Sequence, residues 1–376
     1  MANSGSSVTH DTSAFFPRTT RRFGRGPLTI LLAAAAVALA ACSTTSSSRA
    51  SAAAKTARSS AANTGGSSGG IGCNGRHLKV ALVLPGPAND HGYNAAAVAG
   101  LDAAKKAYCL DTSVTDLVSQ SKSFQVVDSY AASGYNVIIG HNEQFEDAMV
   151  QAAKRYPKVD YFVHAGNVAG NPHVQSSSLA EQDAAYLEGV IAGYLTKTDK
   201  IGFVGYQPLG IIISSMNAFL KGAQSVKPGT KLFHIFTNSL TSASAAIQAT
   251  NTLLANGADV IAHINGGTNS PDILKTAASH HAYAMGFPIN QNAVAPNAVA
   301  TSLLVNYPKL VQDEIKEVVD GTFNGGLKTY SLASGIVGIA PPAAFVPQAA
   351  LAAVNKAKQQ IESGALKVNV SSKNVT

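Results

Sequence analysis

The sequence predicts a parallel α/β protein built from two strand–helix series. Short apolar segments alternate with longer amphipathic ones from Leu78 onward, which is typical of strands and covering helices in parallel sheets. The alternation runs through two successive series of similar length. Composition agrees, because 46% of the 376 residues are apolar and only 13% are charged. This balance supplies material for two cores and excludes disorder over most of the chain.

The first series follows from buried-type apolar runs separated by amphipathic stretches. A strand over 79–84 is the clearest element, since five apolar residues follow Lys79 without a break. The other elements expected in this series are a helix over 93–108, a strand over 137–140, a helix over 144–155 and a strand over 161–163.

The second series repeats the same alternation. A longer helix over 181–195 leads into it. The elements expected next are strands over 201–205, 231–236, 260–264 and 282–286, with helices over 214–225 and 243–256. At the C-terminus we expect segments that cross back between the two halves, namely helices over 308–320 and 347–363 with residues 334–338 between them.

The N-terminal segment has the pattern of a secretory signal. Arg21, Arg22 and Arg25 precede an apolar stretch over 28–41, which is shorter than the roughly 20 residues that a bilayer span needs. Its ending, Leu39-Ala40-Ala41-Cys42, resembles a bacterial lipobox, which predicts a lipid-modified Cys42 as the mature N-terminus. An ordinary signal peptide with a chance cysteine is the alternative. Arg21-Arg22 also leaves open whether export uses the general secretory or the twin-arginine route.

Residues 42–72 are expected to form a flexible linker. They are almost entirely Ser, Ala, Thr and Gly, a composition that cannot bury apolar area. The formal net charge of +7 belongs mostly to residues 1–72, because these hold seven basic residues and one acidic residue. The remainder is close to neutral, so the main argument for a nucleic-acid partner disappears.

Two cysteines remain besides Cys42. Cys73 precedes the first strand and Cys109 follows the first helix. The end of a helix returns near the start of its strand in such a unit, so the two thiols could pair in an oxidising compartment. Two buried free thiols are the alternative.

The loops after the strands are expected to form the binding site. Ligands in open α/β sheets bind outside the carboxyl ends of strands. These loops are rich in Asn, Gly, His and aromatic residues, and they contain no dinucleotide or Walker motif. Metal spacing such as H-E-x-x-H is also absent, so we expect neither metal nor cofactor. The candidate residues are Asp90, Tyr93, Asn94, Asn142, Phe145, His164, Asn167, Tyr206, Gly266, Gly267, Thr268 and Asn290.

The segment from Asp90 to Asn94 carries the most information. Tyr93 could stack on a flat ligand while Asn94 bonds the ligand's edge. Alternatively, Asp90 only caps the first helix and Tyr93 packs on the lobe surface. The glycines at 266 and 267 similarly allow either close backbone approach to a ligand or a tight turn alone.

Several segments resemble the basic membrane protein family, the substrate-binding lipoproteins of ABC transporters that include purine nucleoside receptors. The resemblance begins at Val80 and covers the chain as far as the C-terminal helix. The matching segments, in family order, are 80–87 with 89–94, 152–157, 181–189, 196–198, 201–205, 217–219, 257–261 and 295–296.

This resemblance implies a two-lobe type I periplasmic-binding-protein fold. Each lobe is a parallel sheet flanked by helices, and a three-segment hinge joins the lobes around a ligand. The expected division is a signal over 1–41, a linker over 42–72, an N-terminal lobe of 73–196 plus about 303–325, and a C-terminal lobe of 197–302 plus about 326–376.

The resemblance also assigns roles, and the chain departs from them at two places. Asp90, Tyr93 and Asn94 match the family's ligand-binding motif, with Tyr93 where an aromatic ring stacks on the base. Nucleoside receptors hold ribose with an aspartate where this chain has Pro288, and their lysine is missing from residues 301–306. Ribose recognition is therefore in doubt.

The function predicted is that of a non-catalytic, extracytoplasmic solute-binding lipoprotein of an ABC importer. We expect a monomer that binds a nucleobase ahead of a nucleoside and works with permease and ATPase subunits. It would be tethered to the cell membrane by lipid and face the periplasm or cell exterior. The alternatives are a ligand sensor with the same fold and a secreted hydrolase or metal-binding enzyme.

Overall fold

The computed structural model describes residues 77–375, all within a unit that spans Gly66–Thr376. The expected signal peptide, the linker and Cys42, with its expected lipid, lie outside the described residues. Cys73 also lies outside them. Cys109, at the end of the first helix, is disulfide-bonded. Its expected pairing with Cys73 therefore stays a prediction. No helix within residues 77–375 has the length and hydropathy of a membrane span.

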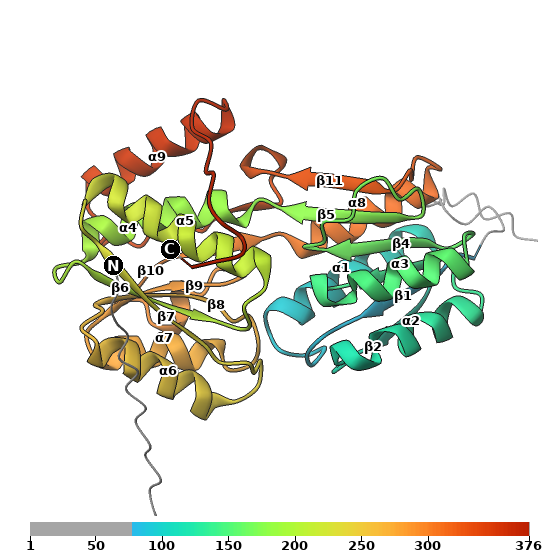
Figure 1. Ribbon diagram of the computed structural model, residues 1–376, viewed down its shortest axis with the longest axis horizontal. Coiled ribbons are helices and arrows are strands. Elements are labelled where there is room, and N and C mark those ends of the chain that lie inside the picture. Colours follow the sequence, from blue (N-terminus) through green and yellow to red (C-terminus); the bar gives the residue numbers. More distant parts are fainter. Residues whose placement is uncertain (1–76, 376) are drawn as a thin grey trace, which may run out of the picture. The chain divides into compact units, whose positions relative to one another are not determined.

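The N-terminal lobe contains a six-stranded, wholly parallel sheet (Figure 1). Its central strands are buried along almost their whole length, as expected where helices cover both faces. In order across the sheet the strands are β11 (Gly326–Tyr330), β5 (Val174–Leu179), β4 (Asp160–His164), β3 (Val137–Gly140), β1 (Lys79–Val83) and β2 (Asp111–Thr115).

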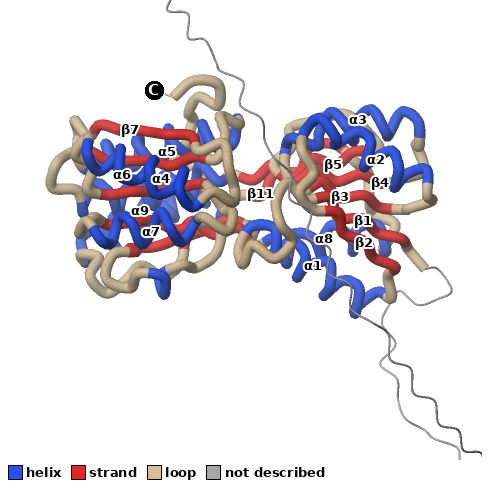
Figure 2. The backbone as a smooth tube through the Cα atoms, turned by 90° about the horizontal axis from the view of Figure 1, so that it is seen from below, coloured by secondary structure: helices blue, strands red, loops and turns tan. Residues whose placement is uncertain are grey.

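Helices pack on both faces of this sheet (Figure 2). One face carries α1 (Tyr93–Tyr108) and α8 (Tyr307–Val319), which contact each other, and the other carries α2 (Ser123–Ala132) and α3 (Glu146–Arg155). Fully buried side chains fill both spaces: Leu82, Leu101 and Val311 on the first face, and Phe145, Met149 and Tyr161 on the second.

The C-terminal lobe repeats this architecture with one antiparallel edge strand. Its sheet runs in the order β12 (Val337–Ile339), β10 (Val299–Val305), β9 (Tyr283–Gly286), β8 (Val260–Ile264), β6 (Lys200–Gly205) and β7 (Lys231–Phe236), and β12 pairs antiparallel to β10. Figure 1 shows α4 (Glu181–Leu195), α5 (Gly210–Val226) and α9 (Gln348–Glu362) on one side of it. On the other side lie α6 (Ala243–Ala255) and α7 (Ser270–Ser279).

The chain passes between the two sheets at three places. These are the links from β5 to α4, from β10 to α8, and from β11 to the second lobe at Leu332. A hydrogen bond from the Ala180 backbone N–H to the Tyr330 carbonyl, 2.9 Å long, joins two of the links. The two-lobe fold with three connecting segments, which the sequence predicts, is thereby confirmed.

Helix α4 belongs with the second sheet by its contacts. It packs on α5, α9, β10 and β12. The pairing with α5 is close, because a Cβ atom at Gly189 would lie 2.0 Å from the Phe219 carbonyl oxygen, and one at Gly222 would lie 2.1 Å from that of Tyr186. The first crossing therefore comes before residue 181, whereas the expected boundary at 196 assigned this helix to the N-terminal lobe. Similarly, β11 pairs with the first sheet although residues from about 326 onward were assigned to the C-terminal lobe.

Most expected elements occur within a few residues of their predicted bounds. Helix α5 begins at 210 instead of 214, and the helix expected over 144–155 is a short 3₁₀ turn, η2 (Glu143–Phe145), followed by α3. The elements that the sequence pattern did not indicate are β2, β5, β10 and β11 and the helices α2 and α7.

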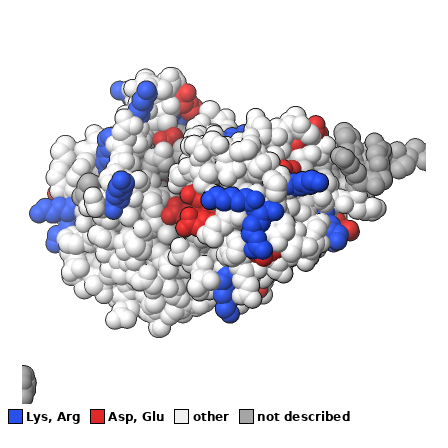
Figure 3. Space-filling view, turned by 45° about the vertical axis from the view of Figure 1, so that its right-hand side comes forward, with Lys and Arg blue, Asp and Glu red and all other residues white. Residues whose placement is uncertain are grey.

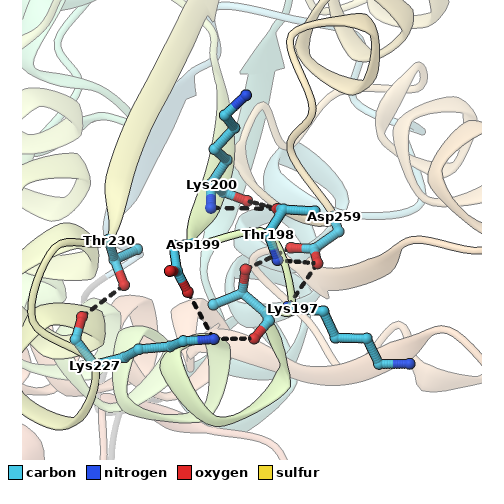
Figure 4. Close-up of polar contacts among 8 residues, drawn as sticks. Lys197, Thr198, Asp199, Lys200, Lys227, Thr230 and Asp259 are labelled. Carbon is cyan, nitrogen blue, oxygen red and sulfur yellow. Dashed lines mark hydrogen bonds and ion pairs between the residues drawn. The ribbon is translucent and has the colours of Figure 1, made fainter.

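One turn brings together two of the segments that resemble the family, 196–198 and 257–261. At the end of the second lobe where β6 begins, Asp259 accepts bonds from the Thr196 hydroxyl (2.6 Å) and from the backbone N–H groups of Lys197 (2.7 Å) and Thr198 (3.0 Å) (Figure 4). Lys227 adds a bond to the Thr196 carbonyl and an ion pair with Asp199. The turn precedes β6, so these residues have a structural role at the strand's start.

Candidate functional site

A cavity lies between the lobes at the carboxyl ends of the strands. Its volume is about 40 Å³, room for only a few water molecules, since one water needs about 10 to 15 Å³. A flat heterocycle can therefore enter only if the lobes or their side chains move apart. Residues of both lobes line it: Pro85, Tyr93, Asn142, Ala165, Glu181, Tyr206, Leu209, Ile211, Ile212, Leu240, Ile264, Gly266, Phe287 and Tyr307.

Tyr93, the first residue of α1, is fixed by His141 at the end of β3. Its hydroxyl donates to the His141 backbone carbonyl at 2.8 Å, while His141 Nε2–H donates to the Tyr93 carbonyl at 2.9 Å. The two rings stack with their centroids 4.0 Å apart. Tyr307 meets the Tyr93 ring edge-on at 5.1 Å. Contacts within the N-terminal lobe thus hold this ring in place.

Behind this pair runs a fully buried chain of polar side chains. His141 Nδ1 lies 2.7 Å from His164 Nδ1, and His164 Nε2 lies 2.8 Å from Glu314 Oε2. The Ser177 hydroxyl donates to Glu314 Oε1 at 2.6 Å. All four residues are inaccessible to solvent. The chain thus joins β3, β4, β5 and α8 under the cavity.

The geometry fixes most protons in this chain. The Tyr93 carbonyl can only accept, so His141 carries its proton on Nε2. Burial and the neighbouring His164 lower the pKa of His141, so its Nδ1 is an acceptor and His164 Nδ1 carries a proton. His164 Nε2 in turn faces Glu314 Oε2, which completes the chain.

Residues of the two lobes contact each other directly beside the cavity. The Tyr93 N–H donates to the Gly266 carbonyl at 3.2 Å, and the Gly210 N–H donates to Glu143 Oε1 at 3.2 Å. Gly210 begins α5, where free backbone N–H groups favour a negative charge. The described arrangement is therefore a closed one.

Glu181 is the carboxyl group that borders the cavity. It is the first residue of α4, directly after a crossing between the lobes, and only 2% of its surface is exposed. Its Oε2 is enclosed and has no hydrogen-bond partner among the described residues. Burial, together with the nearby charge of Glu143, raises the pKa of Glu181 to about 8.

The second lobe forms one wall of the cavity, in which a closely packed glycine and a side-chain amide hold the neighbouring residues. A Cβ atom at Gly266 would lie 2.9 Å from Tyr93 Cβ and 3.1 Å from Phe287 Cε1, so only glycine fits between these residues. The Gln291 side chain accepts from the Phe287 N–H at 2.9 Å and holds that loop. The Phe287 ring lies 6.5 Å from that of Tyr93, with the ring planes 27° apart.

Residues 77–372 match the family described as the PnrA-like substrate-binding proteins of ABC transporters, named Bmp. The chain belongs to the Bmp family. As a substrate-binding protein of this kind it takes a small-molecule ligand and works with permease and ATPase subunits.

Relatives of this Bmp protein carry different names. A CD4+ T-cell-stimulating antigen of Listeria monocytogenes is 27% identical over 78% of this chain and 88% of its own length. The ABC transporter nucleoside-binding protein BmpA of Lactococcus lactis is 27% identical over 69% and 80%. A purine-binding protein of Brucella abortus is 25% identical over 70% and 75%. The transcriptional activator protein Med of Bacillus subtilis is 23% identical over 70% and 82%.

Solved structures share the fold of this Bmp protein. An ABC transporter solute-binding protein of Aeropyrum pernix has a TM-score of 0.70 at 20% identity and covers 77% of this chain and 92% of its own. A transcriptional activator of the comK gene from Bacillus halodurans has a TM-score of 0.65 at 19% identity, with coverage of 77% and 99%.

The candidate residues of this Bmp protein divide into those at the cavity and those behind it. Asp90 accepts bonds from the N–H groups of Gly92, Asn94 and Ala95 and from the Asn94 amide, so its carboxylate caps α1. The candidates that line the cavity are Tyr93, Asn142, Tyr206 and Gly266. The others lie outside its lining: Asp90, Asn94, Phe145, His164, Asn167, Gly267, Thr268 and Asn290.

The residues outside the lining have other contacts. Phe145 is core, and Gly267 packs against the Leu240 carbonyl. Asn167 donates from its backbone to Glu146, while Thr268 and Asn290 are exposed.

Sequence reasoning missed Glu181, Phe287 and Tyr307 in the lining. Glu181 and Tyr307 each begin a helix directly after a crossing between lobes. A polar or aromatic residue at a predicted crossing is the signal that would have indicated them. Phe287 precedes Pro288 and Asn290 in the loop after β9, and nothing in the sequence distinguishes its apolar ring from that of a core residue.

The raised pKa of Glu181 predicts a specific pH dependence of stability. A carboxyl group whose folded-state pKa exceeds its unfolded value binds more protons in the folded state between those values. The free energy of unfolding of the wild type, minus that of Glu181→Gln, should therefore fall as pH rises from about 4.5 to about 8. The slope should reach at most about 1.4 kcal/mol per pH unit. Urea unfolding of both proteins across this range measures it, and a constant difference would contradict a neutral Glu181.

Proposed function

We propose that this protein binds a purine nucleobase, ahead of a nucleoside, between its lobes and delivers it to an ABC importer. The observation that carries the proposal is the lining of the interlobe cavity, where the rings of Tyr93, Tyr206, Phe287 and Tyr307 surround a few polar groups. Such a site suits a flat heterocycle with hydrogen-bonding edges. The names of the nucleoside-binding and purine-binding relatives support the same ligand class.

The preference for a base over a nucleoside rests on what the second lobe offers. Ribose hydroxyls need partners when buried, and an unpaired one costs about 1 to 3 kcal/mol. Pro288 has neither a side-chain acceptor nor an N–H, and its Cδ lies near Gly92. The lining described above contains no lysine or arginine. Cationic side chains instead lie on the outer surface, as one face shows (Figure 3).

Ligand sensing is the second candidate function. It is favoured by the relative of this chain that is named as a transcriptional activator. Uptake of a labelled base by cells with and without this protein separates the two. Uptake that depends on the protein supports import, and unchanged uptake with bound base supports sensing.

We predict that free bases stabilise the protein. Adenine, guanine and hypoxanthine should raise its melting temperature, because ligand at about 100 times its dissociation constant adds roughly 2.7 kcal/mol. Thermal-shift screening should include the matching nucleosides and unrelated sugars and amino acids as controls. Shifts from nucleosides but not bases would refute the preference for bases. No shift from either class would refute a purine ligand.

Tyr206 offers a cleaner test of stacking than Tyr93. Tyr93→Ala would also remove buried contacts with His141 and destabilise the lobe, whereas Tyr206 is half-buried and lines the cavity. If its ring stacks on the base, Tyr206→Ala should weaken binding about 5- to 150-fold, from a stacking energy of roughly 1 to 3 kcal/mol. Calorimetric titration measures this. Tyr194→Ala, which removes a 41%-exposed ring from α4, is the matched control. Equal affinities of the two variants would exclude stacking by Tyr206.

We also propose that Cys42 carries lipid and tethers the protein to the membrane, facing the periplasm or cell exterior. The support is the Leu39-Ala40-Ala41-Cys42 sequence after a basic and apolar segment. Cys42→Ser should abolish lipid labelling and release the protein from the membrane fraction. Cys42→Ser protein that is processed and membrane-bound like the wild type would contradict lipidation at this residue.

A further inference from the structure

The cavity is bordered by an acid, Glu181, with one carboxyl oxygen that no group among the described residues satisfies. Glu181 is 2% exposed, and its enclosed Oε2 has no hydrogen-bond partner among residues 77–375. It lines the cavity between the lobes. A buried polar atom that remains unpaired within the protein costs free energy. A ligand that bonds to it would remove this cost.

The surroundings of Glu181 disfavour a charged carboxylate. The titratable groups that face it are Glu143 from η2, Tyr93 from α1 and Tyr307 from α8. Asp183 lies on its own helix. None of these is a cation, and the described cavity lining includes no lysine or arginine. Burial and the charge of Glu143 therefore raise the pKa of Glu181 to about 8, which leaves it mostly protonated at pH 7.

A neutral carboxyl group presents an O–H donor beside a carbonyl acceptor. A carboxamide presents the same pair, and the amides of Asn and Gln recognise adenine by bonding its N7 acceptor and its N6 amino donor together. A protonated glutamate can read the same kind of edge. A carboxylate cannot, since it only accepts.

We propose that Glu181, in its neutral form, determines ligand specificity by pairing with an edge that sets an acceptor next to an N–H donor. The inference rests on the proposed function and narrows it to heterocycles of which adenine and hypoxanthine are examples. Adenine offers an amino group beside a ring nitrogen, and hypoxanthine a ring N–H beside a carbonyl. 9-Methylpurine lacks both the exocyclic group and the N–H beside N3, so it is the matched control ligand.

The first test compares two substitutions at this position in the full chain. Glu181→Ala should weaken binding of adenine and hypoxanthine about 5- to 150-fold, because it leaves a buried ligand group unpaired. Glu181→Gln should restore most of that affinity, since it keeps the donor and the acceptor. Binding of 9-methylpurine should change much less in both variants. Calorimetric titration at pH 7 gives all these affinities.

The second test uses pH. The wild-type affinity for adenine should fall as pH rises above about 8, by at most tenfold per pH unit, as Glu181 loses its proton. The affinity of Glu181→Gln should stay level over the same range. Glu188→Gln is the matched control, because Glu188 lies on the same helix, is equally buried and has a raised pKa, yet lies outside the cavity lining. It should retain the wild-type pH dependence.

The outcomes separate this inference from the proposed function. A wild type that binds none of adenine, hypoxanthine and their nucleosides refutes the proposed purine ligand. If Glu181→Ala binds these ligands as tightly as the wild type does, only the role of Glu181 is refuted. If Glu181→Gln binds as weakly as Glu181→Ala, and wild-type affinity rises with pH, then the carboxylate is the binding form and the inference is overturned.

Discussion

The mutual hydrogen bonds between Tyr93 and His141 are the interaction on which the site depends. Each residue bonds the other's backbone, so the start of α1 and the end of β3 hold a single relative position. The chain through His164 to Glu314 extends this constraint to α8, which directly follows strand β10 of the second lobe. Because the chain is fully buried, removing one member would leave the others unpaired, at a cost of about 1 to 3 kcal/mol for each neutral group.

The crossings between the lobes supply both the hinge and part of the binding surface. Glu181 and Tyr307 each follow a crossing directly, and both line the cavity. A change in the angle between the lobes must therefore move Glu181, on α4 of the second lobe, relative to Tyr93 and Tyr307, which pack together in the first lobe. The bond from Gly210 to Glu143 forms only when the lobes are close, and Glu143 in turn affects the charge of Glu181. Closure and ligand chemistry are thus coupled through neighbouring carboxyl groups.

The sequence predicted those buried elements that consist of consecutive apolar residues. Strand β3 is apolar and buried throughout, and β8 is buried throughout with His263 as its one polar residue, so their pattern is clear. Strand β5 is equally buried but contains Gln175 and three serines, since it lies beside the polar chain that ends at Glu314. No single-sequence pattern could indicate it. Glu181 also gives no signal in the sequence. It has the pattern of an ordinary charged residue at the start of a helix, and its burial depends on the opposite lobe.

The electrostatics of the cavity limit what can bind there. An anionic ligand would meet Glu181 in the lining, with no cation there and with the charge of Glu143 nearby. A cationic ligand would need the Glu181 carboxylate, and removing the proton at pH 7 from a group with a pKa of about 8 costs only about 1.4 kcal/mol. That cost alone would not exclude a cation. The stronger argument for a neutral ligand comes from the lining, because its four aromatic rings and few polar side chains match an uncharged, flat heterocycle.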